Sequence, residues 1–401
     1  MFADIDTQLK HISRGVIDIF PKEEFIAKLT KSRQENRPLR VKLGIDPTRP
    51  DIHLGHGVPL NKLRHFQELG HQAVLIIGDY TGMIGDPSGQ DTTRPTITHD
   101  QVMENAKTYL AQVGKIIDLS RTEIVHNGDW FAKMTFLDVI RLASKMTVAR
   151  MIERDDFKKR YTEGQPISLH EFMYPLMQGY DSVMVRSDVE IGGNDQTFNL
   201  LVGRRLQEDA GQPQQVALTL PLLVGLDGVM KMSKSYGNYI GISEEPYAMY
   251  GKTMSLPDAM LRTYFDLTSD VTPEETERLL AGSPMDAKLG LAFSLVKRYH
   301  GGAAAKEASE RFDREVRKKE MPDAVPEVRV PADAFQDGKV WIAKLIVVCG
   351  LADSTSQARR LVVQGAVSID GEAITDANLN VVPKHGSLLK AGKRKFARIV
   401  P

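Results

Sequence analysis

Two histidines three residues apart, His53 and His56, lie where a strand-like pattern of residues gives way to a helical one. Gly55 and Gly57 beside them would let a phosphate group approach the first turn of that helix, where the dipole favours anions. Imidazole N–H groups can donate hydrogen bonds to phosphate oxygens. The pair could instead be structural, or could bind a metal, although no nearby glutamate or third histidine completes a metal site. By itself the pair leaves an anion site and structural histidines both open, and it predicts no metal site.

A second candidate is a loop that reads KMSKS at residues 231–235, after an apolar run at residues 216–224 and a turn at Asp227-Gly228. A loop with two lysines is usually a solvated surface feature. Lysines on a mobile loop also suit phosphate chemistry, because they can close on negative charge as it develops. The two motifs together are far more specific than either alone.

Three side chains at positions i, i+4 and i+7, namely Tyr174, Gln178 and Asp181, share one face of a predicted helix. Their near neighbours are apolar, which favours a polar stripe facing a pocket. The alternative is that Tyr174 packs in the core and that the other two side chains lie on the surface. Residues 192–196 (GGNDQ) add a glycine turn and further polar groups.

The elements that must position these residues follow an α/β pattern. Residues 39–46 alternate between apolar and polar side chains, a helical pattern runs through Leu60 to Leu69 and ends at Gly70, and residues 73–77 are an apolar run. Strand, helix and strand at this spacing form a βαβ unit, which builds parallel sheets that bind ligands at the carboxyl ends of the strands. The alternation resumes at residues 189–191, 197–207 and 216–224. We therefore expect a Rossmann-like parallel sheet.

The chain is long enough for several domains. We expect a Rossmann-like catalytic domain at residues 1–240, with a helical, methionine-containing insertion at about 130–165, and a helical domain at 241–320. Three prolines mark a linker at 321–338. Residues 339–401 carry ten lysines and arginines against four acids, so this small α+β module is expected to bind RNA.

Composition is that of an ordinary globular protein with a net charge of zero over 401 residues. Cys349 is the only cysteine, which excludes intramolecular disulfides and fits a reducing compartment. The N-terminal residues lack the apolar core of a signal peptide, and no apolar run is long enough to span a bilayer. We expect a cytoplasmic protein without a membrane partner.

The paired motifs resemble those of the class I aminoacyl-tRNA synthetases, usually written HIGH and KMSKS. This resemblance implies that ATP is a substrate, that Mg²⁺ accompanies the ATP, that tRNA is a partner and that no tightly bound cofactor is needed. It implies a catalytic role for His53, His56, Lys231 and Lys234, and ATP binding by Gly55, Ser233 and Ser235.

The helix and the glycine turn resemble those of the tyrosyl-tRNA synthetases, whose substrates are L-tyrosine, ATP and tRNA(Tyr). In that family Asp181 would bind the phenol hydroxyl, and such an acid rejects phenylalanine because phenylalanine would leave it unpaired. The remaining amino-acid contacts implied by the resemblance are Tyr174, Gln178, Asp86 and Gln196. The implied contacts to ATP or the adenylate are Gly44, Asp46, Thr48 and Asp195.

Two positions depart from the best-known form of that family. Lys42 stands where a tyrosine on the first strand would be a second partner of the phenol. By alternation it shares a face with Asp46, so we expect it to point into the tyrosine site and either to pair with a carboxylate or to fill space. Gln90 replaces a lysine that assists pyrophosphate, so Arg94, which matches the family's arginine, is expected to carry more of that work.

The C-terminal segment resembles a small RNA-binding domain first described in a ribosomal protein, which bacterial tyrosyl enzymes carry and tryptophanyl enzymes normally lack. Its expected RNA contacts are Arg359, Arg360, Lys393, Arg394 and Lys395. The resemblance also implies a homodimer, with the helical insertion as its contact. A tryptophanyl synthetase and a non-catalytic RNA-binding relative are the alternatives.

Overall fold

The structure is a computed structural model that describes residues 2–48, 51–87, 97–317, 325–392 and 395–400. The chain divides into two compact units, residues 1–308 and 309–401. No helix in the described ranges is long and apolar enough to cross a membrane.

The larger unit is built on a six-stranded sheet in the order β1-β6-β5-β2-β3-β4. Every neighbouring pair is parallel except β1 with β6. The chain moves from β2 to β3 on one side and returns to β5 on the other, so β2 and β5 form the switch point at which α/β sheets bind ligands. The parallel sheet was predicted, whereas the antiparallel edge strand β1 was not. The strands are β1 (Asp18–Phe20), β2 (Arg40–Ile45), β3 (Gln72–Ile77), β4 (Thr122–His126), β5 (Val189–Gly193) and β6 (Val216–Leu220).

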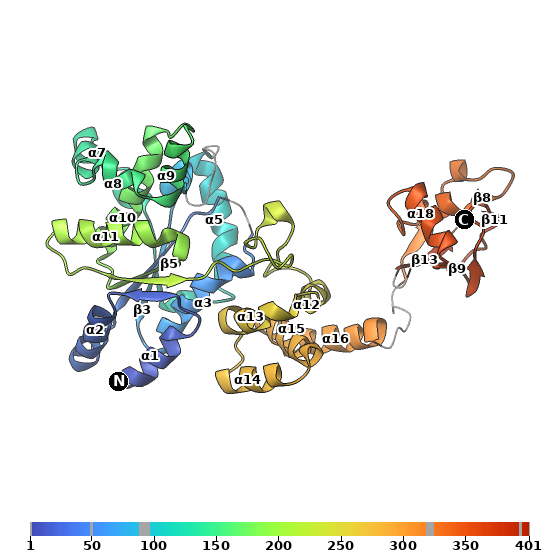
Figure 1. Ribbon diagram of the computed structural model, residues 1–401, viewed down its shortest axis with the longest axis horizontal. Coiled ribbons are helices and arrows are strands. Elements are labelled where there is room, and N and C mark those ends of the chain that lie inside the picture. Colours follow the sequence, from blue (N-terminus) through green and yellow to red (C-terminus); the bar gives the residue numbers. More distant parts are fainter. Residues whose placement is uncertain (1, 49–50, 88–96, 318–324, 393–394, 401) are drawn as a thin grey trace. The chain divides into compact units, whose positions relative to one another are not determined.

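Helices cover both faces of this sheet. In Figure 1, α10 and α11 lie on one side of it and α1 and α3 on the other. Helix α3 ends as the sequence predicts, because Gly70 just beyond it takes a positive φ of 90°. Helix α10 carries the predicted polar stripe. The helices are α1 (Ile5–Ser13), α2 (Lys22–Glu35), α3 (Leu54–Glu68), α4 (Thr81–Ile84), α5 (His99–Val113), α10 (Met173–Val185) and α11 (Thr197–Asp209).

A helical insertion separates β4 from α10, as predicted. It consists of α6 (Gly128–Phe131), α7 (Phe136–Ala143), α8 (Val148–Ile152) and α9 (Asp155–Thr162). Its methionines serve the core: Met151 is buried, and Met134 and Met146 pack against the same apolar cluster. Helix α7 leaves part of its apolar face uncovered, since Phe136, Leu137 and Ile140 are all exposed.

The region after the sheet is helical, in agreement with the sequence. It comprises α12 (Pro246–Met254), α13 (Leu261–Thr268), α14 (Pro273–Ala281), α15 (Pro284–His300) and α16 (Gly302–Phe312), followed by a π-helical turn at Asp313–Arg317.

In its described residues from 325 onwards, the smaller unit contains a five-stranded sheet in the order β10-β9-β12-β13-β7, a two-stranded sheet β11-β8, and two α-helices. Strand β7 lies inside the segment expected to be a linker, and it pairs with β13 in parallel. The folded unit therefore starts before residue 339, and the linker expected at 321–338 is too long. The elements are β7 (Glu327–Arg329), β8 (Val340–Trp341), α17 (Ile342–Val348), α18 (Thr355–Val363), β9 (Val367–Ile369), β10 (Glu372–Ile374), β11 (Asn380–Val381), β12 (Leu388–Ala391) and β13 (Lys395–Val400).

Candidate active site

Two cavities meet at the carboxyl ends of the central strands. The inner cavity, of about 290 Å³, is lined by residues of β2, α10 and the turn after β5. The outer cavity, of about 580 Å³, is lined by the start of α3 and by the lysine loop. Thr48, His56 and Tyr109 line both. A ligand in one cavity can therefore reach a ligand in the other.

Asp181 lies at the buried wall of the inner cavity. Asn127 and Trp130 donate hydrogen bonds to its two carboxylate oxygens, at 3.3 and 3.0 Å. Burial raises the pKa of Asp181 to about 7, although the nearby Lys42 ammonium and these donors pull it down. The carboxylate is thus about half ionised near neutral pH, and its oxygens have lone pairs available for one more donor, such as a phenol.

Lys42 lies beneath the inner cavity, fully buried. Its ammonium donates to the carbonyl oxygen of Gln178 at 2.7 Å and to Ser182 Oγ at 2.8 Å, and it pairs with Glu190 Oε1 at 2.8 Å. Of the two roles expected for Lys42, the structure therefore has the pairing with a carboxylate. Because three acceptors occupy its three protons, the expected direct contact with the substrate is replaced by a position behind the pocket wall.

Tyr174 and Asp46 form a second polar wall. The Tyr174 hydroxyl donates to Asp46 Oδ2 at 2.8 Å, and Thr81 Oγ1 donates to Asp46 Oδ1 at 2.7 Å. Burial, followed by the charges of Asp46 and Asp86, raises the pKa of Tyr174 well above its usual value, so the hydroxyl stays a donor. Gly78 makes room for this arrangement, since a Cβ there would lie 1.9 Å from Asp46 Oδ1.

A chain of side-chain amides links α10 to the loop after α4. Asn199 donates to Gln178 Oε1 at 2.9 Å and to Gln196 Oε1 at 2.8 Å, and Gln196 donates to Asp86 Oδ2 at 2.7 Å. Arg154 pairs with the other oxygen of Asp86 at 3.2 Å. Three of the residues expected to bind the amino acid are thereby held together on one side of the cavity.

His53 and His56 stack on each other, with ring centroids 3.8 Å apart, at the first turn of α3. His53 Nδ1 accepts from the Gly55 amide at 3.1 Å, and His56 Nδ1 accepts from the His53 amide at 3.3 Å. Burial lowers the pKa of His53 to about 2, whereas desolvation and the charge of Lys234 lower the pKa of the more exposed His56 to about 4, so both are neutral. A neutral imidazole whose Nδ1 accepts carries its proton on Nε2, so each ring has one N–H to donate.

The lysine loop is held by Asn238, which is buried. Asn238 Oδ1 accepts from the Ser233 amide at 2.8 Å, and its Nδ2 donates to Asp227 Oδ2 at 2.6 Å. The predicted turn at Asp227-Gly228 is confirmed, because Asp227 Oδ1 accepts from two following amides and Gly228 has a positive φ.

The chain after the loop pairs with the start of α3: the Leu54 amide donates to Ile240 O at 2.9 Å, and the Ile242 amide to Ile52 O at 3.1 Å. The two motifs, about 180 residues apart in sequence, thus share one cavity. Lys231, Ser233, Lys234 and Ser235 line this cavity with Gly55, and Lys234 pairs with Asp51 at 2.9 Å.

The remaining expected site residues lie partly at the cavities and partly away from them. Asp195 is exposed in the 3₁₀ turn after β5 and lines neither cavity. Arg359 and Arg360 are exposed on α18, and Lys395 is exposed at the start of β13. Gly44 lines the inner cavity, at the end of β2. Arg94, Gln90, Lys393 and Arg394 lie outside the described residues.

Several residues at the site were missed in the sequence. Glu190 falls within a short apolar strand pattern, and Arg154 falls within a charge-rich helical segment, so neither has a local signal. Asn127 follows a strand of the sheet directly, and a polar residue at the end of a parallel strand is the one signal that could have pointed to the site.

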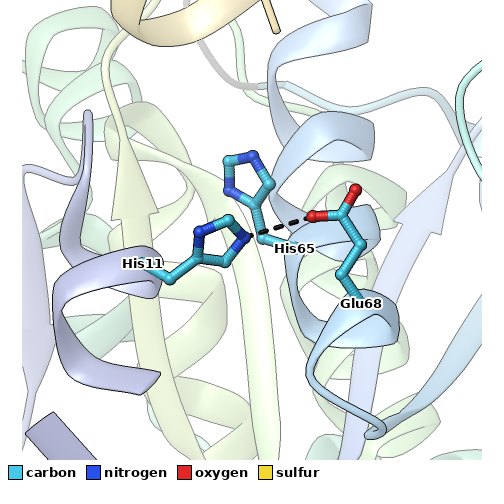
Figure 2. A group of neighbouring side chains, drawn as sticks. All are labelled: His11, His65 and Glu68. Atoms are coloured by element: carbon cyan, nitrogen blue, oxygen red, sulfur yellow. Dashed lines mark hydrogen bonds and ion pairs between the residues drawn. The ribbon is translucent and has the colours of Figure 1, made fainter. Parts of the chain in front are cut away.

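One group of possible metal ligands lies at the other end of α3. His11, His65 and Glu68 face one another between α1 and α3, with His11 Nε2 3.2 Å from Glu68 Oε2 (Figure 2). Burial, and then the surrounding cations, lower the pKa of His65 to about 2. Those cations include Lys62, Arg64 and Arg298, which would oppose a divalent ion. The geometry favours a contact between two helices over a metal site.

The family described as tRNA synthetases class I (W and Y) matches residues 34–316, and the S4 domain matches residues 340–385. A Tyrosine--tRNA ligase of Moorella thermoacetica is 53% identical over 402 residues, covering 99% of this chain and 96% of that protein. Tyrosine--tRNA ligase 2 of Vibrio cholerae is 52% identical, covering 99% of each.

Solved structures agree in fold. A C-terminally truncated mitochondrial tyrosyl-tRNA synthetase of Aspergillus nidulans superposes with a TM-score of 0.63 at 22% identity, over 76% of this chain and 92% of that one. An enzyme of Archaeoglobus fulgidus, solved with L-tyrosine, has a TM-score of 0.60 at 22% identity, over 76% of this chain and 100% of that one.

The sheet, the two motifs in one cavity and the family match define the class as that of the class I tRNA synthetases for tryptophan and tyrosine. Identity of about one half, along the whole length, to proteins named as tyrosine–tRNA ligases favours tyrosine over tryptophan. The chain belongs to the tyrosine–tRNA ligase family, and the predicted fold, with its basic C-terminal RNA-binding domain, is confirmed.

Proposed function

We propose that this chain activates L-tyrosine with ATP at the two joined cavities and transfers it to tRNA(Tyr). The inner cavity would hold tyrosine and the outer cavity the phosphates of ATP. The observation that carries the assignment is Asp181, a buried carboxylate with free acceptor capacity at the wall of an amino-acid-sized cavity. Bound tyrosine would direct its phenol at Asp181 and its carboxylate towards the outer cavity.

In the first step a tyrosine carboxylate oxygen attacks the α-phosphorus of ATP. A new O–P bond forms, the bond to the bridging oxygen breaks, and its electron pair leaves with pyrophosphate, so no protein base is required. Catalysis must come from alignment and from stabilisation of the developing charge. The Nε2–H groups of His53 and His56 are donors for phosphate oxygens, and Lys231 and Lys234 neutralise the departing pyrophosphate.

Lys234 would exchange its Asp51 partner for a phosphate when ATP binds. It pairs with Asp51 across the outer cavity, and the Asp51 side chain is 65% exposed. Because solvent screens the exposed Asp51, the pair is worth little, about 0–1 kcal/mol, and a phosphate can replace it without much loss. Asp51 would then hold the lysine in place between turnovers.

Mg²⁺ would enter with ATP. Asp51 is the only carboxylate among the described residues that line the outer cavity, alongside hydroxyls of Thr48, Ser233 and Ser235. Mg²⁺ bound by so few protein oxygens suits a site in which phosphates and water supply most ligands. The ion would offset phosphate charge there.

In the second step a ribose hydroxyl at the 3′ end of tRNA attacks the tyrosyl carbonyl, and AMP leaves. The exposed Arg359, Arg360 and Lys395, together with Lys393 and Arg394, would bind the tRNA backbone. We further propose a cytoplasmic homodimer whose contact includes the exposed apolar face of α7.

Amino-acid-dependent exchange of labelled pyrophosphate into ATP tests the proposal. We expect tyrosine to drive exchange and tryptophan to fail. Exchange driven by tryptophan would favour the tryptophanyl alternative, and no exchange with any amino acid would leave a non-catalytic RNA-binding relative.

A further inference from the structure

The buried pair of Lys42 and Glu190 contacts more of the site than its own strands. Glu190 Oε1 also accepts from Gln178 Nε2 at 3.2 Å, and Glu190 Oε2 accepts from Ser182 Oγ at 3.0 Å and from Gln215 Nε2. Lys42 and Glu190 are 0% and 1% exposed. The pair therefore joins β2 and β5, at the switch point of the sheet, to the pocket-lining helix α10.

This network fixes the orientation of the Gln178 amide. Its Nε2 is held by Glu190, which leaves Oε1 as the acceptor that faces Asn199 and the amide chain. A reversed amide would place two donors, from Gln178 and Asn199, against each other, and would set a carbonyl oxygen against the Glu190 carboxylate. The pair thus fixes the orientation in which the Gln178 amide lines the inner cavity.

The same pair sets the charge environment of Asp181. Lys42 on β2 lowers the pKa of Asp181, and Glu190 on β5 raises it by a smaller amount. The other groups around this carboxylate are the neutral donors Asn127 and Trp130. Thr81 links Asp46 to Asn127, since its hydroxyl donates to Asp46 and accepts from the Asn127 amide.

We propose that Lys42 and Glu190 are positioning residues for tyrosine, which act through Gln178 at one end of the substrate and through Asp181 at the other without touching it. Tyrosine recognition here would use one acceptor for the phenol, Asp181, supported from behind by a buried cation. This inference rests on the proposed placement of tyrosine in the inner cavity.

The pH dependence of tyrosine-driven pyrophosphate exchange tests it, since kcat/KM for tyrosine reports the ionisation of the free protein. With Lys42→Met, we expect the acidic limb of this profile to move to higher pH. With Glu190→Gln, we expect it to move to lower pH. The double variant, whose buried pair is neutral, should have its limb between those of the two single variants and above that of the unmodified chain.

A purely structural pair would not give shifts in opposite directions. Both single variants should also raise the KM for tyrosine at least about tenfold, the loss expected for disturbing hydrogen bonds to a charged group, and leave the KM for ATP within about twofold. Lys62→Met is the matched control: it removes another buried lysine, one that binds the carbonyl oxygens of Ile12 and Arg14, and should leave the limb in place.

Folding is checked for each variant by its thermal unfolding. Folded single variants whose limbs stay in place, or move in the same direction, would overturn the inference. If a single variant does not fold, the double variant decides: an unmoved limb overturns the inference and an upward shift supports it. The Asp181→Asn variant tests the proposed function separately. If it kept full tyrosine-driven exchange, the proposed placement of tyrosine against Asp181 would be wrong, whatever the role of Lys42 and Glu190.

Discussion

At the scale of single residues, the chemistry of the site rests on which groups are charged. Both histidines of the first motif are neutral donors because desolvation and the charge of Lys234 lower their pKa values. We therefore propose that the positive charge that meets the phosphates comes from the lysine loop, with Arg94 expected to contribute. The acid that meets tyrosine is poised near neutrality, so its ionisation falls within the working pH range.

The first prediction concerns pH. The ionised Asp181 carboxylate accepts a much stronger hydrogen bond from the phenol hydroxyl than its protonated form does, and its pKa is raised to about 7. The fraction able to bind tyrosine therefore falls as pH drops through 7, and kcat/KM for tyrosine at pH 6 should be about one tenth of its plateau above pH 8. A profile of exchange rate against pH checks this. An acidic limb centred near pH 4 would show either that the pKa of Asp181 is not raised or that Asp181 does not bind tyrosine.

The second prediction concerns the lysines. Lys231→Met and Lys234→Met each remove a cation that acts most strongly as pyrophosphate departs. Each should lower kcat for exchange about 100-fold, the cost typical of one lost transition-state contact, with the KM for tyrosine within about twofold. Steady-state exchange kinetics measure both constants. Lys288→Met, which removes a lysine that pairs with Asp258 and does not line the outer cavity, is the control and should keep kcat within about threefold.

At the scale of secondary structure, the sequence predicted the elements that carry the two motifs and the polar stripe. These elements have local signatures: Gly70 ends α3, Asp227-Gly228 makes a turn, and the spacing of Tyr174, Gln178 and Asp181 fits one helix face. The contacts that complete the site are long-range. Glu190 meets Lys42 and Arg154 meets Asp86 across distances in sequence that no local pattern encodes.

Alternation along the strand predicted the position of the Lys42 side chain only in part. It placed the side chain on the same side of β2 as the pocket, but it could not show that Glu190 and Ser182 would hold the ammonium behind the pocket wall. The β7 strand was missed for a related reason. The three residues of β7, in a short segment between two prolines, have no strand pattern of their own, and they form a strand because they pair with β13.

The third prediction belongs to α7. Its exposed Phe136, Leu137 and Ile140 form an apolar face on a helix of a folded domain, which favours burial in a subunit contact. Ile140→Asp should shift the chain from dimer to monomer at micromolar concentration, as measured by sedimentation. Thr162→Asp, at the end of α9 and outside this face, is a control for added charge. An unmodified chain that sediments as a monomer would contradict the dimer.

At the scale of the whole molecule, the chain combines a catalytic unit with a separately folded basic unit. The smaller unit has its own core, built around Ile342, Leu345, Val362 and Leu389, all buried. Its surface carries the exposed arginines of α18. Division of labour follows from this arrangement: adenylate formation should depend on the first unit alone, and transfer should need both.

The fourth prediction tests that division. Arg359→Ala with Arg360→Ala should raise the KM for tRNA(Tyr) in aminoacylation, because each lost phosphate contact weakens binding and reduces its salt dependence. Pyrophosphate exchange should be unchanged. Val363→Ala, an exposed residue of the same helix without charge, serves as the control. Unchanged aminoacylation at low tRNA concentration would remove these arginines from the RNA contact.

We propose that the Asp181 carboxylate in the inner cavity selects tyrosine. The most direct test is the ratio of kcat/KM for tyrosine to that for phenylalanine in pyrophosphate exchange, for the unmodified chain and for Asp181→Asn. We predict that the unmodified chain favours tyrosine by about 10⁴-fold or more, and that the variant loses at least about 100-fold of this ratio, mainly through tyrosine. An unchanged ratio in a folded Asp181→Asn variant would contradict the account.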